Sequence, residues 1–177
     1  MHRDLKKISV SAEEISAMNK RIGEAISRDF KDKNPLFIGL LKGCIPFMPD
    51  MLKYVLIPCT IDYVRASSYE GTKTTGDVRI HGHIPNVEGR HVIIVDDIID
   101  TGRTLEAIRR LFLERGALSV TNCVLLDKPE GRVIDITPAY VGGLVPNEFV
   151  VGYGLDYNER YRNLPYIGVL REEIYKK

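Results

Sequence analysis

The segment from Val92 to Leu105 carries side chains that could bind a metal ion, sugar hydroxyls and a phosphate. It begins with an apolar, β-branched run, which predicts a buried strand that ends in the adjacent acids Asp96 and Asp97. A third acid, Asp100, opens a Thr-Gly-x-Thr turn that leads into a predicted helix. One short segment therefore offers three carboxylates and a turn suited to phosphate at the carboxyl end of a strand.

The two adjacent acids are expected to point to opposite sides, because side chains alternate along a strand. Asp96 and Asp97 are then not a simple chelating pair, but their oxygens suit two ribose hydroxyls or the water shell of Mg²⁺. Each acid has a plainer interpretation when taken alone. The pair would be a solvated strand end, and Asp100 would be a helix N-cap. Their combination with the turn favours a binding site.

The loop Asp100-Thr101-Gly102-Arg103-Thr104 predicts an anion site. Its backbone N–H groups, the two threonine hydroxyls and the N-terminus of a helix would all face a bound phosphate. Gly102 permits a close backbone approach or a positive φ. Neither a GxxxxGK[ST] loop nor a GxGxxG motif is present, since Gly152-Tyr153-Gly154 lacks the third glycine. A P-loop and a dinucleotide site are therefore disfavoured.

Length and composition predict a single domain over residues 1–177. Hydrophobic residues make up 44% and charged residues 28%, which argues against disorder, and the net charge of +1 gives no pull toward nucleic acid or membrane. The start of the chain lacks a secretory pattern and is expected to be solvated around Asp4, Lys6 and Lys7. Three widely spaced cysteines indicate reduced thiols in a cytoplasmic protein without a zinc site.

Strands and helices are predicted to alternate, which implies an α/β fold with a central, mostly parallel sheet flanked by helices. The first helix starts at the capping box Ser11-Ala12-Glu13-Glu14. Two more are expected, one over 45–55, with Pro46 and Pro49 in its first turn, and one over 104–115. Predicted strands cover residues 36–41, 60–65, 77–81, 120–126, 140–141, 149–151 and 166–170, besides the opening one.

Val92 to Leu105 closely resembles the signature of the phosphoribosyltransferases, in which such a loop holds the 5-phosphate of phosphoribosyl pyrophosphate. The resemblance implies a type I phosphoribosyltransferase fold, with a small hood built from the chain ends and the purine-side segment. One departure is Asp96, which stands where many relatives carry Glu. The side chain is about one methylene shorter, and ribose binding should survive this change.

Three further segments are similar to the hypoxanthine-guanine branch of this family. Leu41-Lys42-Gly43 matches a loop that touches pyrophosphate, often through a cis peptide. Ser68-Tyr69, followed by Thr75-Gly76-Asp77, matches a flexible loop that closes over the site. The purine-binding part is matched by Leu125 to Lys128 and by Phe149 to Tyr157, with Arg162 following.

The resemblance implies a reaction in which N9 of hypoxanthine or guanine displaces pyrophosphate from the ribose and gives IMP or GMP. Asp100 would be the catalytic base. The residues implied to bind phosphoribosyl pyrophosphate are Lys42, Gly43, Asp96, Asp97, Asp100, Thr101, Gly102, Arg103, Thr104 and Arg162. Those implied to bind the purine are Lys128, Phe149, Val150 and Asp156. Mg²⁺ would be held by Asp96, Asp97 and Asp156.

Two other functions are open. One is an enzyme that prefers xanthine, which differs from the other bases only at position 2. The other is a nucleotide-sensing regulator that keeps the fold, although such a protein would be expected to lose catalytic groups or to gain a basic face. Family members form dimers and tetramers, so a homodimer or homotetramer is expected.

Overall fold

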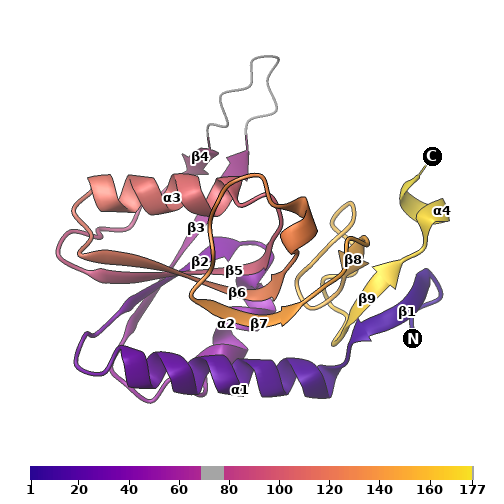
Figure 1. Cartoon of the computed structure of the whole chain (residues 1–177), viewed down its shortest axis with the longest axis horizontal. Helices are drawn as coiled ribbons and strands as arrows, with labels where there is room; N and C mark the ends of the chain where they lie inside the picture. The colour runs from indigo at the N-terminus through magenta and orange to yellow at the C-terminus, as the bar shows by residue number, and fades with distance from the viewer. Residues whose placement is uncertain (69–77, 177) are drawn as a thin grey trace.

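Two sheets of unequal size organise the chain in the computed structural model, which describes residues 1–68 and 78–176 (Figure 1). The larger sheet has the strand order β4-β3-β2-β5-β6-β7, and the smaller has the order β1-β9-β8. In chain order the elements are β1 (Leu5–Val10), α1 (Ala12–Asp29), β2 (Leu36–Leu41), α2 (Cys44–Leu52), β3 (Thr60–Ser68), β4 (Val78–His81), β5 (His91–Ile99), α3 (Arg103–Glu114), β6 (Ser119–Asp127), the 3₁₀ turn η1 (Pro129–Gly131), β7 (Tyr140–Leu144), β8 (Val150–Val151), β9 (Ile167–Leu170) and α4 (Glu172–Tyr175).

The larger sheet is parallel except at one edge, where β4 pairs antiparallel with β3. Alternate residues of the central strand β5 pack on opposite faces of the sheet. Ile93 and Val95 belong to the cluster that includes α1 and α2, whereas Val92 and Ile94 belong to the cluster that includes α3. All four are fully buried, and each contributes about 1.5–3 kcal/mol by leaving water. The predicted α/β fold with flanking helices is confirmed.

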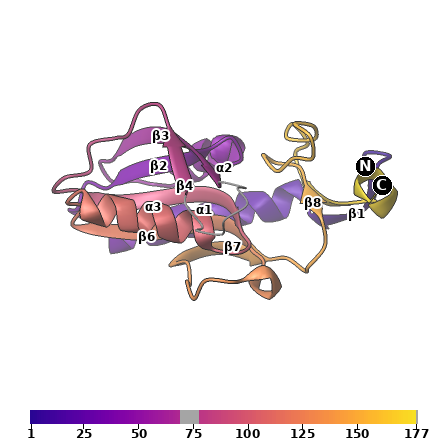
Figure 2. The same ribbon diagram turned by 90° about the horizontal axis from the view of Figure 1, so that it is seen from above.

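The smaller sheet forms the expected hood at one end of the molecule (Figure 2). It pairs β1 from the start of the chain with β9 from its end, and β9 with β8 from the segment that the resemblance implies to bind the purine, all antiparallel. The solvated start predicted around Asp4, Lys6 and Lys7 is confirmed for the two exposed lysines and is wrong for Asp4, whose side chain is only 23% exposed. Leu5 is fully buried, and Asp4 accepts a hydrogen bond of 2.8 Å from the Tyr161 hydroxyl. The charged residues around Leu5 gave no strand pattern, and β1 is stabilised by its pairing with β9.

Helix α1 begins as predicted. The Ser11 side chain accepts from the Glu14 N–H at 3.2 Å, and the Glu14 side chain accepts from the Ser11 N–H at 2.7 Å. Helix α2 differs from its prediction, because only Pro46 lies in the first turn and Pro49 lies inside the helix. Proline removes one backbone hydrogen bond there. The helix is retained because it is short and packs its apolar face in the core, with Phe47, Met48 and Met51 buried.

Strand β5 is longer than predicted. It continues through Asp96 and Asp97 to Ile99, because β6 stays paired beside it as far as Ile99 and Asp127. The acids therefore lie within the strand rather than after it. This places both carboxylates on a rigid element, which suits precise positioning of a ligand.

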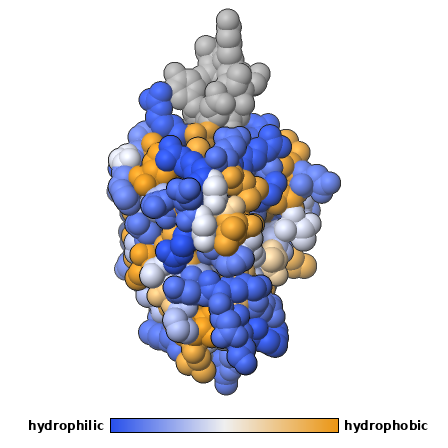
Figure 3. Space-filling view, turned by 90° about the vertical axis from the view of Figure 1, so that its left-hand side faces the viewer, coloured by the Kyte–Doolittle hydropathy of each residue, from blue (hydrophilic) through white to orange (hydrophobic). Residues whose placement is uncertain are grey.

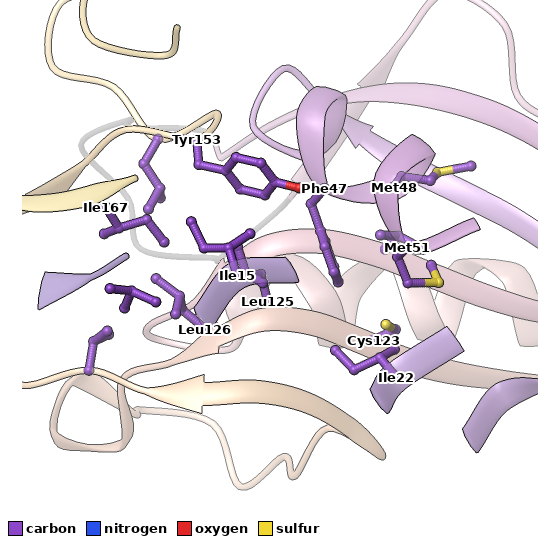
Figure 4. Close-up of a cluster of buried hydrophobic side chains, with 14 of the residues drawn as sticks. Ile15, Ile22, Phe47, Met48, Met51, Cys123, Leu125, Leu126, Tyr153 and Ile167 are labelled. Carbon is purple, nitrogen blue, oxygen red and sulfur yellow. The ribbon is translucent and has the colours of Figure 1, made fainter. Parts of the chain in front are cut away.

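Tyr153 fastens the chain between β8 and β9 to the helices of the main core. Figure 4 shows its ring reaching from the hood side toward Phe47 of α2. The hydroxyl accepts from Asn19 Nδ2 at 2.9 Å and donates to Asp50 Oδ2 at 2.7 Å. Burial raises the pKa of Tyr153, and the hydrogen bond to Asp50 raises it further, so the phenol stays protonated and can donate.

We expect Tyr153→Phe to lower the free energy of unfolding by about 1–3 kcal/mol, because it leaves the buried amide of Asn19 without this acceptor. Urea denaturation followed by circular dichroism measures this loss. Tyr54→Phe, which removes a hydroxyl from the neighbouring surface groove, is the matched control. Equal stability of Tyr153→Phe and the wild type would contradict the anchoring role.

The end of the molecule that faces away from the hood presents hydrophobic side chains interspersed among hydrophilic ones (Figure 3). None of the helices in residues 1–68 and 78–176 combines the length and the apolar character that crossing a membrane would need.

Candidate active site

Asp96 and Asp97 lie side by side near the carboxyl end of β5. Asp96 Oδ1 accepts from the Asp97 N–H at 3.0 Å, and Asp97 Oδ1 accepts from the Ile98 N–H at 2.8 Å. Asp96 lines the small cavity at the loop after β5, whereas Asp97 Oδ2 lies against Gly43 in the loop after β2. The two carboxylates therefore contact different parts of the site, and their divergence across the strand stays a prediction.

Crowding of the two acids disfavours their charged forms. Burial raises the pKa of Asp96 well above its ordinary value, and the charge of Asp97 and their shared hydrogen bond raise it further. Burial also raises the pKa of Asp97, although hydrogen bonds from Asp96 and the Ile98 N–H, together with the charge of Arg162, oppose that rise. A cation or several hydroxyl donors at this position would offset the cost of ionising both groups.

The loop after β5 encloses a small cavity of about 140 Å³. Its lining includes five of the predicted site residues, namely Asp96, Asp100, Thr101, Gly102 and Thr104. Gly102 has φ of 82° and is the N-cap of α3, so the alternative of Asp100 as the N-cap is wrong. Arg103 is exposed as the first helical residue, outside the lining. A helix N-terminus with two nearby hydroxyls suits a phosphate group.

Arg132 holds this loop in place, and no sequence motif pointed to it. Its guanidinium donates to the Asp100 carbonyl at 2.9 Å, to the Ile136 carbonyl at 2.5 Å and to the Asp127 carboxylate. The Thr101 carbonyl also accepts from the backbone of the same segment. The planar fork of arginine can serve three acceptors at once. The position of Asp100 is therefore set from outside its own strand.

Lys128 and Asp100 meet at the edge of the cavity. The Lys128 Nζ lies 3.4 Å from Asp100 Oδ2, and the Lys128 N–H donates to the Ile99 carbonyl at 3.0 Å. The lysine side chain is only 16% exposed, so it is not an ordinary surface lysine. This pair places a donor-only ammonium beside a proton-accepting carboxylate.

A second loop, which follows β2, packs against the Asp97 carboxylate. The peptide between Leu41 and Lys42 is cis, as the family resemblance implied. Gly43 packs so tightly that a Cβ there would overlap Asp97 Oδ2. A Cβ on Gly154, in the segment after β8, would in turn overlap the Gly43 carbonyl. Two glycines thus allow this loop, Asp97 of β5 and the segment after β8 to touch.

Gly43→Ala is expected to raise the KM for phosphoribosyl pyrophosphate by roughly 10- to 100-fold, since the new methyl group displaces the Asp97 carboxylate. The backbone of Gly43 is helical, so alanine fits its φ and ψ and the fold should persist. Steady-state kinetics with varied phosphoribosyl pyrophosphate measure the change, and thermal unfolding confirms folding. A variant that folds and keeps the wild-type KM would contradict this packing role.

Arg162 connects the predicted pyrophosphate and purine segments. It donates to the Gly154 carbonyl at 2.6 Å and pairs with Asp156 at 2.8 Å. Glu159, which sequence reasoning missed, lies 2.9 Å from Lys42 Nζ and 3.5 Å from Arg162 Nη2. The two predicted pyrophosphate-binding cations are thus brought together. Asp156 also accepts from the Glu159 N–H at 2.8 Å, so it has the turn-forming role typical of its residue type.

Phe149 lies at the edge of the hood rather than in the core. It is 37% exposed, and its ring stacks on Tyr175 at 4.9 Å and meets Tyr157 edge-on at 5.7 Å. The Val150 side chain is buried in the main cluster, so only its backbone could face a ligand. Ser68 ends β3, whereas Tyr69 and the rest of the predicted flexible loop lie outside the described residues.

The predicted metal ligands do not form one cluster. In the described part of the chain, no group of three or more His, Cys, Asp or Glu side chains could by itself hold a metal ion. Mg²⁺ nevertheless binds through one or two carboxylates together with substrate phosphates. Asp96 and Asp97 therefore fit an ion that arrives with its substrate, whereas Asp156 is already paired with Arg162.

Comparison with known proteins identifies the class to which this fold and site belong. The family model described as "Phosphoribosyl transferase domain" matches residues 11–158. The chain belongs to the phosphoribosyltransferase family.

The similar proteins narrow the class to its hypoxanthine-guanine branch. The chain is 49% identical to the hypoxanthine-guanine phosphoribosyltransferase of Streptococcus pneumoniae R6, over 99% of this chain and 98% of that protein. It is 50% identical to the protein of the same name from Streptococcus thermophilus CNRZ 1066, over 100% and 99% of the two chains. A crystal structure of a hypoxanthine phosphoribosyltransferase from Staphylococcus aureus superposes with a TM-score of 0.95 at 43% identity and covers 100% of this chain and 97% of that one.

Proposed function

We propose that this protein is a purine-salvage enzyme that transfers the 5-phosphoribosyl group from phosphoribosyl pyrophosphate to N9 of hypoxanthine or guanine. The products are IMP or GMP and pyrophosphate. The observation that carries the proposal is the pair of Lys128 and Asp100 beside the phosphate loop. An ammonium group only donates, so it favours the 6-oxo group of these bases over the 6-amino group of adenine. The adjacent carboxylate can accept the proton of N7.

Each step of the reaction can be assigned to residues of this chain. The loop over 100–104 holds the 5-phosphate, and Asp96 and Asp97 hold the ribose hydroxyls. Lys42, Gly43 and Arg162 bind the pyrophosphate, which leaves as the C1–O bond breaks and the C1–N9 bond forms. Arginine suits this task because its fork matches phosphate oxygens. The proton on N7 passes to Asp100.

The purine is placed by Lys128 at its 6-oxo group and by Phe149 against its ring, since aromatic rings stack in offset fashion. Backbone carbonyls near Val150 and Asp156 would accept from the 2-amino group of guanine. Xanthine has an oxo group at that position and would find acceptors instead of donors. This chemistry favours hypoxanthine and guanine over the alternative of a xanthine-preferring enzyme.

Mg²⁺ is the proposed cofactor, with Asp96 and Asp97 as its ligands. Asp156 keeps its pair with Arg162 and would reach a second ion through bound water. The bound ion would neutralise charge on the pyrophosphate. The raised pKa of the adjacent acids and their hard oxygen atoms support this choice of cation. We further expect the protein to act in the cytoplasm as a homodimer or homotetramer, which sedimentation analysis would distinguish.

The deciding experiment is a pyrophosphate-release assay on one preparation with hypoxanthine, guanine, xanthine and adenine. We expect kcat/KM to be high for the first two and lower by orders of magnitude for adenine, because its amino group leaves the Lys128 ammonium without an acceptor. A preference for xanthine would select the alternative enzyme. Turnover with none of the four bases would instead favour the nucleotide-sensing regulator.

A further inference from the structure

Glu159 contacts both cations that the proposed function assigns to pyrophosphate. One carboxylate oxygen, Oε2, lies 2.9 Å from Lys42 Nζ and 3.5 Å from Arg162 Nη2. Lys42 follows β2 and Arg162 follows β8, so a single carboxylate connects two parts of the site that are far apart in sequence. Phosphate oxygens bound by these cations would need the same donors.

The backbone at Glu159 makes its residue type unexpected. Tyr157 and Arg160 exchange two backbone hydrogen bonds, of 3.3 Å and 3.1 Å, so Asn158 and Glu159 form a two-residue hairpin turn. The φ angles of the two turn residues are 51° and 62°. Asn-Gly is strongly preferred in a turn with two positive φ angles, because glycine adopts that conformation without strain.

Packing does not explain why a glutamate occupies this position, because its side chain is 63% exposed. Its contacts are with charged groups of the site. An unfavourable backbone conformation that is retained beside a binding site is typical of a residue whose side chain has a function there.

We propose that Glu159 is an internal competitor for pyrophosphate: its carboxylate pairs with Lys42 and Arg162 and has to leave them when pyrophosphate binds. The inference rests on the proposed function, in which these two cations form the pyrophosphate clamp. Arg162 keeps its position during the exchange, because it also pairs with Asp156 at 2.8 Å and donates to the Gly154 carbonyl at 2.6 Å. Competition weakens the hold on pyrophosphate and thereby eases its release as a product.

The effect should be modest and dependent on salt. Exposed ion pairs contribute little to stability, so the release of one such pair corresponds to about a two- to fivefold change in affinity. Ionic strength screens exposed charges, and the difference should shrink as salt is raised.

The test is titration calorimetry of the full-length protein with inorganic pyrophosphate and Mg²⁺. We expect Glu159→Gln to bind pyrophosphate about two- to fivefold more tightly than the wild type, with an unchanged KM for hypoxanthine. Glu130→Gln is the matched control, since Glu130 is an exposed glutamate next to Lys128 and it should leave the affinity unchanged. Equally tighter binding in both variants would show that any lost negative charge has this effect. Weaker binding by Glu159→Gln would show that Glu159 positions the cations instead of competing with pyrophosphate. Either result overturns the proposal.

A double-mutant cycle separates this inference from the proposed function. Lys42→Gln should weaken pyrophosphate binding, and Glu159→Gln should have a smaller effect in that background, because the partner of the carboxylate is gone. If Lys42→Gln leaves the affinity unchanged, the clamp itself is wrong and both ideas fall. If Lys42→Gln weakens binding but the two substitutions act independently, only the competitor role is overturned.

Discussion

Replacing Asp100 with alanine is expected to lower kcat with hypoxanthine by about 10²- to 10⁴-fold and to leave the affinity for phosphoribosyl pyrophosphate nearly unchanged. The carboxylate lies 3.4 Å from Lys128 Nζ, where it can accept the proton of N7. The backbone of the phosphate loop should persist without it, because Arg132 binds the Asp100 carbonyl rather than the carboxylate. Steady-state kcat and calorimetric binding of phosphoribosyl pyrophosphate measure the two parameters separately.

Two variants sharpen this prediction. Asp100→Asn keeps the size of the side chain but cannot accept a proton as a base, so it should be nearly as slow as the alanine variant. Asp135→Ala removes an exposed carboxylate from the neighbouring segment and should retain wild-type turnover. Turnover by Asp100→Ala within about twofold of the wild type would refute the role of this residue as the base.

Replacing Lys128 with alanine is expected to raise the KM for hypoxanthine and guanine by about 10- to 100-fold, with little change in the KM for phosphoribosyl pyrophosphate. A hydrogen bond from a charged donor to the 6-oxo group contributes about 1.5–3 kcal/mol, and its loss leaves a polar group of the base unpaired. The side chain is 16% exposed, so water replaces it poorly. Because Lys128 also pairs with Asp100, kcat should fall as well.

The informative quantity for Lys128 is the ratio of the two KM changes. Lys20→Ala, which removes an exposed lysine of α1 far from the site in sequence, provides the baseline. Equal increases in KM for the base and for phosphoribosyl pyrophosphate would show that Lys128 supports the site as a whole and does not recognise the purine.

The proposed pyrophosphate clamp contains a carboxylate, that of Glu159, in addition to its two cations. Lys42 and Arg162 look like two free cations in the sequence, but a carboxylate joins them in the fold. Asn158 and Glu159 occupy a turn whose residue preference runs against glutamate. This conflict between local preference and observed residue is the kind of signal that marks functional positions.

Local signals allowed much of the fold to be predicted. The apolar run over Leu36–Leu41 matches β2 residue for residue, and the capping box located the start of α1. The turn chemistry of Gly102 gave the start of α3 to within one residue. The errors arose where pairing overrides local sequence. Strand β1 was not predicted because its sequence is charged, and it is stabilised by pairing with β9. The acids of β5 lie inside the strand because pairing with β6 continues beyond them.

The sequence by itself determined the chemical groups of this protein, namely three acids, a loop suited to phosphate and a lysine in the spacing of its family. Each of these motifs is a short continuous segment, and its residue types dictate its chemistry. Only the tertiary structure decided how these groups meet. The contact of Lys128 with Asp100, the support from Arg132 and the pairing of Lys42 with Glu159 all join residues from separate segments. Such contacts depend on the register of strands and on how closely glycines let loops approach, and no local pattern encodes either.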